Sequence, residues 1–163
     1  MRKLLSNGLA VVAGVVSWPT AGTPADSAKP PVAQHRKPPA HDPRLACLRT
    51  FFGQANCPAA ELSPTFLEAA DIYGLDWRLL PSLSFVETTG GKAAPHNNLF
   101  GWNSGRAAFS SAAACIRSVA YSLSSSALYK GKDIDGILKT YNQKASYGRQ
   151  VKDVMRRIAP VAD

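Results

Sequence analysis

The sequence has few cysteines and few charged residues, and these scarcities exclude several classes of protein. Three cysteines among 163 residues are too few for a miniprotein that disulfides hold together. Charged residues make up 18% of the chain and hydrophobic residues 45%, which argues against a wholly disordered protein. After the N-terminal segment no apolar run reaches the roughly 18 residues of a membrane span, so we do not expect an integral membrane protein once that segment is removed.

Several motifs of known chemistry are also absent. The three histidines do not have metal-ligand spacing, and no phosphate-binding loop, dinucleotide-binding glycine pattern, serine-hydrolase elbow or zinc-protease motif occurs. No signature of a nucleic-acid-binding module is present. The net charge of +8 favours anionic partners such as nucleic acid, anionic polymers or membrane surfaces, but charge alone does not define a function.

The first 41 residues have the composition of a leader and a spacer. Arg2 and Lys3 precede a short apolar stretch and then small residues, which is typical of a secretory signal peptide over residues 1–25. An uncleaved anchor helix is the alternative, and the stretch is short for one. Residues 26–41 are rich in proline and lysine, which predicts a disordered spacer. We therefore expect an exported protein of the periplasm, cell envelope or extracellular space.

The remaining residues, 42–163, predict one all-α domain of five or six short helices. Helix-start signals precede several segments, including Asp42-Pro43 and Ser63-Pro64, and apolar residues recur within them at helical spacing. No sustained alternation of the kind that strands require occurs. Gly53 is expected to end the first helix, and Pro81 to bend or restart the third. The expected helices cover residues 43–53, 63–73, 77–88, 111–124, 133–141 and 146–158.

The cysteines allow more than one arrangement. Cys47 and Cys57 flank the end of the first expected helix, so a disulfide between them is the favoured prediction for an exported chain. A bridge to Cys115 and three reduced thiols are the alternatives. Cys115 lies on the apolar face of an expected helix, which favours a core residue over a nucleophile.

Glu87 is the residue with the strongest indication of chemistry. It lies near the end of a strongly apolar expected helix and precedes small residues and a Gly-Gly turn. Partial burial and the negative end of the helix dipole both disfavour the ionised form, so the pKa of this carboxyl should rise. A carboxyl group that stays protonated near neutral pH can donate a proton to a glycosidic oxygen. A surface glutamate next to an apolar face is the alternative.

Two further segments supply groups that suit a sugar. Asn97 and Asn98 offer amide donors and acceptors, while Phe100 and Trp102 offer flat apolar faces. Structural roles in a turn-rich loop are the alternative for these residues. Near the end of the chain, Tyr141 and Tyr147 could bring phenolic hydroxyls to the same groove or belong to the core.

Together the three segments resemble the bacterial glucosaminidase domain, a family of peptidoglycan-cleaving endo-β-N-acetylglucosaminidases in the lysozyme-like superfamily. The resemblance rests on Glu87-Thr88, on the Asn-Asn-Leu-Phe-Gly block of residues 97–101, and on Tyr141 followed by Tyr147. It implies a lysozyme-like helical fold that cleaves β-1,4 bonds of the glycan strand after N-acetylglucosamine, acts as a monomer and needs no metal or organic cofactor. Glu87 would be the catalytic acid and Tyr141 a groove tyrosine beside it. The residues that would bind substrate are Asn97, Asn98, Phe100, Trp102 and Tyr147.

The sequence departs from this family in one respect. The family often has a longer segment between the glutamate and the asparagine block, sometimes a β-hairpin lobe with a second acidic residue, and here the nine intervening residues contain no acidic residue. Asp133 and Asp135 are the nearest later candidates for a second carboxylate, although either could simply cap a helix. The main rival hypothesis is therefore a non-catalytic glycan-binding module with the same groove. A basic protein that binds nucleic acid or membrane surfaces is a third, based on charge alone.

Overall fold

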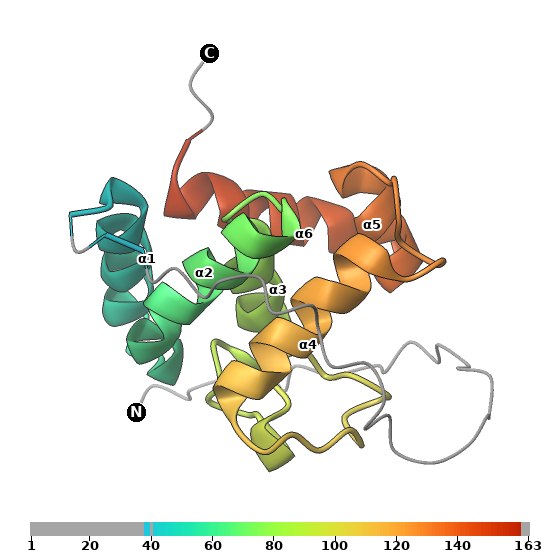
Figure 1. Ribbon diagram of the computed structural model, residues 1–163, viewed down its shortest axis with the longest axis horizontal. Coiled ribbons are helices and arrows are strands. Elements are labelled where there is room, and N and C mark those ends of the chain that lie inside the picture. The colour runs from blue at the N-terminus through green and yellow to red at the C-terminus, as the bar shows by residue number, and fades with distance from the viewer. Residues whose placement is uncertain (1–37, 40, 161–163) are drawn as a thin grey trace, which may run out of the picture.

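We analysed a computed structural model of the chain, which describes residues 38–39 and 41–160. The proposed signal peptide and almost all of the proposed spacer lie outside these residues. Within the described part all of the secondary structure is helical, which confirms the all-α prediction (Figure 1). The elements are α1 (Pro43–Gln54), η1 (Pro58–Leu62), α2 (Ser63–Tyr73), α3 (Leu79–Thr88), η2 (Pro95–Asn97), α4 (Ala112–Ser125), α5 (Ile134–Tyr141) and α6 (Ala145–Ile158).

Local capping chemistry accounts for half of the α-helix N-termini and for the end of α2. Asp42, Ser111 and Asp133 are N-caps of α1, α4 and α5, and each side chain accepts a hydrogen bond from a backbone N–H of the first turn. Gly74 ends α2 in the left-handed conformation, with φ of +64°, where a residue without Cβ is favoured. These caps fall within one or two residues of the helix ends that the sequence predicts.

Two sequence predictions about helix ends were wrong. Gly53 does not end α1, which continues through Gln54. Pro81 does not bend α3, because Asp76 to Arg78 form a turn and the helix begins at Leu79. Pro81 thus lies in the first turn, where a backbone N–H has no partner within the helix, and its missing donor costs nothing there.

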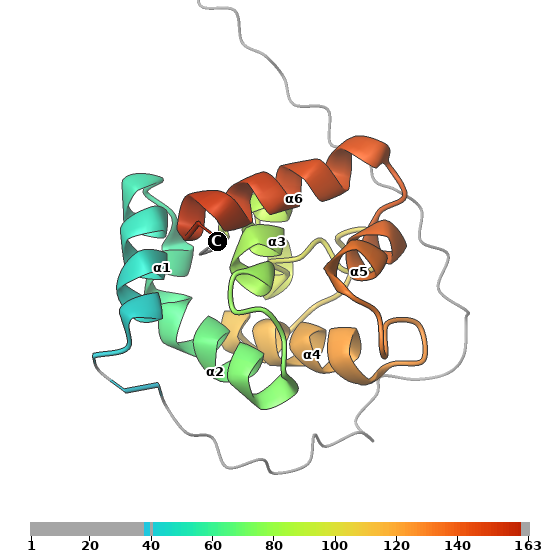
Figure 2. The same ribbon diagram turned by 90° about the horizontal axis from the view of Figure 1, so that it is seen from above.

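Helix α3 lies at the centre of the domain. Figure 2 shows it with α6 on one side and with α2 and α4 on the other, while α1 and α5 occupy opposite ends. Its buried face includes Leu79, Leu80 and Leu83, each at most 1% exposed. The residues that follow its last turn pack against the end of α1 and the start of η1, where the Ala59 backbone N–H donates to the Gly90 carbonyl.

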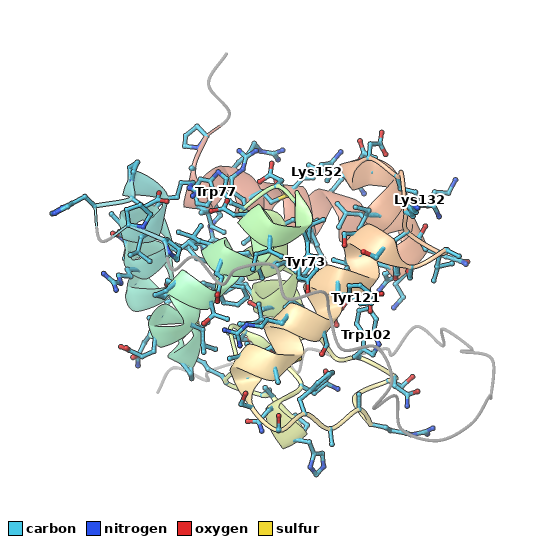
Figure 3. All side chains as sticks on the ribbon, in the orientation of Figure 1. Tyr73, Trp77, Trp102, Tyr121, Lys132 and Lys152 are labelled. Atoms are coloured by element: carbon cyan, nitrogen blue, oxygen red, sulfur yellow. The ribbon has the colours of Figure 1, made fainter. Side chains whose placement is uncertain are left out.

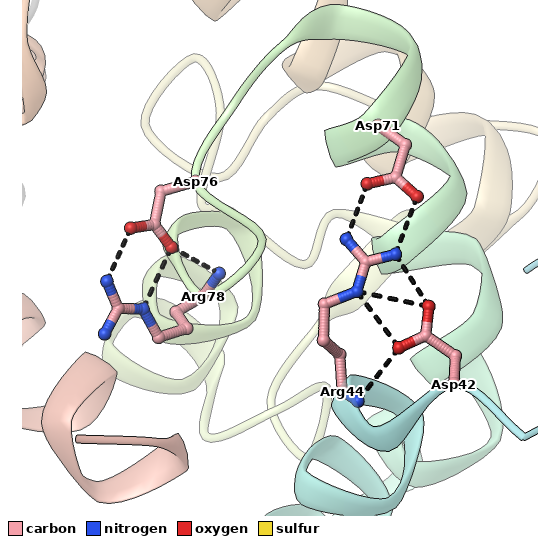
Figure 4. Close-up of polar contacts among 5 residues, drawn as sticks. All are labelled: Asp42, Arg44, Asp71, Asp76 and Arg78. Carbon is pink, nitrogen blue, oxygen red and sulfur yellow. Dashed lines mark hydrogen bonds and ion pairs between the residues drawn. The ribbon is translucent and has the colours of Figure 1, made fainter. Parts of the chain in front are cut away.

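Two arginines form ion pairs at the start of α1 and in the turn between α2 and α3 (Figure 4). Arg44 pairs with Asp42 and also with Asp71 of α2, at 2.6 and 2.7 Å. Arg78 pairs with Asp76 at 2.7 Å and donates to the Ala159 carbonyl after α6. These groups are partly exposed, so each pair stabilises the fold by at most about 1 kcal/mol.

The favoured disulfide is not formed in the structure, where Cys47, Cys57 and Cys115 are all free. Cys57 is buried against Gly90 in the loop after α3, and its thiol donates to the Ala55 carbonyl at 3.5 Å. Its contacts are thus with that loop and with its own turn. As expected, Cys115 is a buried core residue of α4. Among residues 38–39 and 41–160, no helix has the length and hydropathy to cross a membrane.

Candidate active site

Glu87 occupies the last turn of α3. Thr89 caps this end in a left-handed conformation, with φ of +53°, and its backbone N–H bonds back to the Phe85 carbonyl. The helix approaches through the core, so the Glu87 side chain is partly buried. The local prediction from sequence is therefore confirmed: a carboxyl group stands at the C-terminal end of an apolar helix.

Thr88 ties the end of α3 to the asparagine block. Its hydroxyl lies 2.8 Å from the Leu99 carbonyl, to which it donates, and accepts a hydrogen bond from the Gly91 backbone N–H at 3.1 Å. Thr88 is only 4% exposed, so solvent does not compete for these bonds. This connection brings residues 97–101 against the last turn that carries Glu87.

Asn98 shapes the loop that faces Glu87. Its side-chain oxygen accepts from the Trp102 backbone N–H at 2.8 Å, and its amide nitrogen donates to the Trp102 carbonyl at 2.9 Å. The enclosed Gly101 has φ of +60°, and a Cβ at this position would lie 3.1 Å from Glu87 Oε2. Glycine therefore serves two purposes here: it allows the turn, and it leaves room for the carboxyl group.

Tyrosines from α5 and α6 complete the surroundings of Glu87. The Tyr147 hydroxyl donates to Glu87 Oε1 at 2.6 Å, and the Tyr141 hydroxyl donates to the Phe100 carbonyl at 2.7 Å. The two tyrosine rings stack with centroids 5.9 Å apart and planes 6° apart. Trp102 meets Tyr141 edge-on, with a centroid distance of 5.9 Å. The result is an aromatic cluster (Trp102, Tyr141 and Tyr147) beside one carboxyl group.

The electrostatics shift Glu87 toward its protonated form. Burial raises the pKa of its carboxyl, and the hydrogen bond from Tyr147 opposes that rise. Burial also raises the pKa values of Tyr141 and Tyr147, so both stay neutral donors. The hydrogen-bond partner of Glu87 is thus a neutral phenol. By contrast, Arg or Lys pairs with Asp42, Glu68, Asp71, Asp76, Asp135 and Asp153.

The structure gathers some of the proposed site residues and separates others. Tyr147 touches Glu87, Tyr141 stacks on Tyr147, and Trp102 is partly exposed next to Tyr141. Asn98 and Phe100 are each 1% exposed, so they build the loop and core. Asn97 is exposed and donates to the Phe109 carbonyl, which holds the far end of the same loop.

The two candidates for a second carboxylate have other partners. Asp133 accepts from the Gly136 backbone N–H at 2.8 Å as the N-cap of α5. Asp135 forms an ion pair with Lys152 at 2.7 Å, and its side chain is 71% exposed. The structure therefore accounts for both aspartates through α5 and α6, without a contact to Glu87.

Sequence reasoning missed two residues that position the site. Gly101 is the last residue of the asparagine block, yet only the fold shows that it lies against Glu87. Cys115 of α4 is buried, and burial raises the pKa of its thiol to about 11, while the Leu99 and Phe100 backbone N–H groups oppose that rise. Comparisons with protein-family models, curated proteins and solved structures find no match to this chain.

Proposed function

We propose that the chain is an exported peptidoglycan hydrolase that cleaves β-1,4 glycosidic bonds after N-acetylglucosamine, with Glu87 as general acid. The observation that carries this proposal is the setting of one carboxyl group. Glu87 is partly buried, its pKa is raised, Tyr147 holds one oxygen, and Gly101 of the asparagine block lies against the other. A carboxyl with these properties suits proton donation to a leaving glycosidic oxygen.

The hydrogen bond from Tyr147 indicates which oxygen would carry the proton. Tyr147 donates to Oε1, so the acidic proton of Glu87 belongs on Oε2, the oxygen beside Gly101. From there the proton would pass to the glycosidic oxygen while positive charge develops at the anomeric carbon. Loss of the proton leaves a carboxylate whose charge the Tyr147 hydrogen bond stabilises.

The aromatic cluster supports a carbohydrate substrate. Trp102 is partly exposed, and a flat aromatic face packs well against the apolar C–H face of a pyranose. The Asn98 side chain holds its backbone through two hydrogen bonds, and its ring packs edge-on against the Tyr141 ring. This rigidity would hold a sugar ring in one position relative to Glu87.

One observation favours a second function, a glycan-binding module that does not cut. Asp133 and Asp135 serve a helix cap and an ion pair, so neither stands opposite Glu87 as a base or nucleophile. Catalysis would then need water or the acetamido group of the substrate to assist the single acid. If neither assists, the same residues would bind the glycan without cleaving it.

Zymography with purified sacculi separates the two functions. The test compares wild type with Glu87→Gln and with Glu61→Gln, a matched control because Glu61 is an exposed glutamate on η1. The hydrolase predicts clearing by wild type and Glu61→Gln, no clearing by Glu87→Gln, and binding to sacculi by all three. Binding without clearing by the wild type would support the module instead.

A further inference from the structure

The net positive charge of the domain comes from its C-terminal third. Residues 41–125 contain six basic and six acidic residues, whereas residues 126–160 contain eight basic and three acidic ones. In the first part, Arg44, Arg78 and Arg117 pair with carboxylates, so the charge there is neutralised locally. The excess of cations lies on α5, on α6 and on the segments that lead into them.

A concavity of about 270 Å³ lies between α5 and α6, within this basic region. Lys139 and Arg149 are exposed, and within residues 38–39 and 41–160 neither forms an ion pair. Lys152 pairs with Asp135, and Figure 3 shows it on α6 beside α5. The lining residues are Asp135, Leu138, Lys139, Asn142, Gln143, Ala145, Gly148, Arg149 and Lys152.

This concavity is separate from the site around Glu87, although α5 and α6 contribute residues to both. Glu87 does not line it. Asn142, which does, directly follows Tyr141 of the aromatic cluster, and Gly148 directly follows Tyr147. Residues 141–148 therefore include both tyrosines of the aromatic cluster and part of the lining of the concavity.

We propose that the concavity binds the carboxylates of short peptides attached to the glycan, an inference that rests on the proposed function. Lys139 and Arg149 supply unpaired positive charge, and the Asn142 and Gln143 amides can hydrogen-bond peptide groups. Asp135 stands in the same lining, where it neutralises Lys152 and so weakens the attraction for a polyphosphate. The mixed lining thus favours an acidic peptide over a nucleic acid or a phosphate polymer.

The test is a binding titration followed by NMR, with the full-length chain and a synthetic N-acetylated Ala–Glu–Lys–Ala peptide, which carries one net negative charge. The same acetylated peptide with Gln for Glu, which has no net charge, serves as the neutral comparison. The Lys139→Ala/Arg149→Ala variant removes the two unpaired cations. Its matched control, Arg49→Ala/Lys130→Ala, removes the same charge from exposed positions outside the concavity.

We expect the acidic peptide to bind the wild type about tenfold more tightly than the neutral peptide does. The double variant should lose this tenfold preference, and the control variant should keep it within twofold. Glu87→Gln should bind the peptide as the wild type does, so a failure of the hydrolase proposal leaves this test intact. Equal affinity for the two peptides, equal loss in both double variants, or displacement of the peptide by equimolar polyphosphate would overturn the inference.

Discussion

Gly101→Ala is the substitution that tests the geometry of the site most sharply. The new Cβ would lie 3.1 Å from Glu87 Oε2, whereas ordinary contacts of a Cβ begin near 3.4 Å. The Glu87 carboxyl group would have to move by about 0.3 Å or more, against the hydrogen bond that Tyr147 donates to its other oxygen. The backbone is strained as well, because Gly101 has φ of +60°.

These two effects have different magnitudes and different readouts. An alanine in the left-handed region costs about 1–2 kcal/mol of the free energy of unfolding. A displacement of about 1 Å at a catalytic group lowers the rate on the order of 100-fold, so a shift of about 0.3 Å predicts a loss of at least about 4-fold in kcat. Stability and activity should therefore both fall, and the loss of activity should exceed what partial unfolding explains.

Gly105→Ala is the matched control in the same loop. Gly105 also has a left-handed backbone, with φ of +80°, but a Cβ there would meet nothing within 4 Å. Denaturant unfolding should show a similar loss of stability in both variants, and turnover of purified sacculi should fall only in Gly101→Ala. Wild-type turnover in Gly101→Ala, or an equal loss in Gly105→Ala, would refute the reasoning.

Further predictions concern the carboxyl group, a helix cap and the thiols. Tyr147→Phe removes a hydrogen bond that lowers the pKa of Glu87, so the alkaline limb of the pH–rate profile should move to higher pH. The raised pKa of Glu87 contributes stability that is present below the ordinary value near 4.3 and is lost as pH rises through the folded-state pKa. Thermal melting should therefore show Glu87→Gln gaining stability over the wild type as pH rises from 4 to 8, and a constant difference would contradict this. Asp133→Ala should lower the free energy of unfolding by about 1 kcal/mol in urea titrations, because α5 loses its N-cap. Thiol titration of the unfolded chain without reductant should find three free thiols, and a count of one would mean that a disulfide forms.

The helices could be predicted from sequence because their signals are local. Asp42, Ser111 and Asp133 each satisfy a backbone N–H within their own first turn, so a short stretch of sequence contains the whole interaction. The position of Glu87 at a helix end was predictable for the same reason. Pro81 was misread because its effect depends on where the helix begins, and the turn at Asp76 decides that.

The rest of the site depends on contacts between distant segments. The pairing of Tyr147 with Glu87 joins residues 60 positions apart, and the contact of Gly101 with Glu87 depends on the hydrogen bonds of Thr88 and Asn98. An asparagine in a loop can bind a ligand or its own backbone, and residue type alone does not distinguish these roles. The structure shows that Asn98 binds the backbone of Trp102.

Mass spectrometry of the fragments released from purified sacculi tests the central claim most directly, because the new reducing end identifies the bond that is cut. The account predicts that the wild type and Glu61→Gln release fragments ending in N-acetylglucosamine. Glu87→Gln should release none while its binding to sacculi is retained. Fragments with a different reducing sugar, or equal release by Glu87→Gln, would contradict the account.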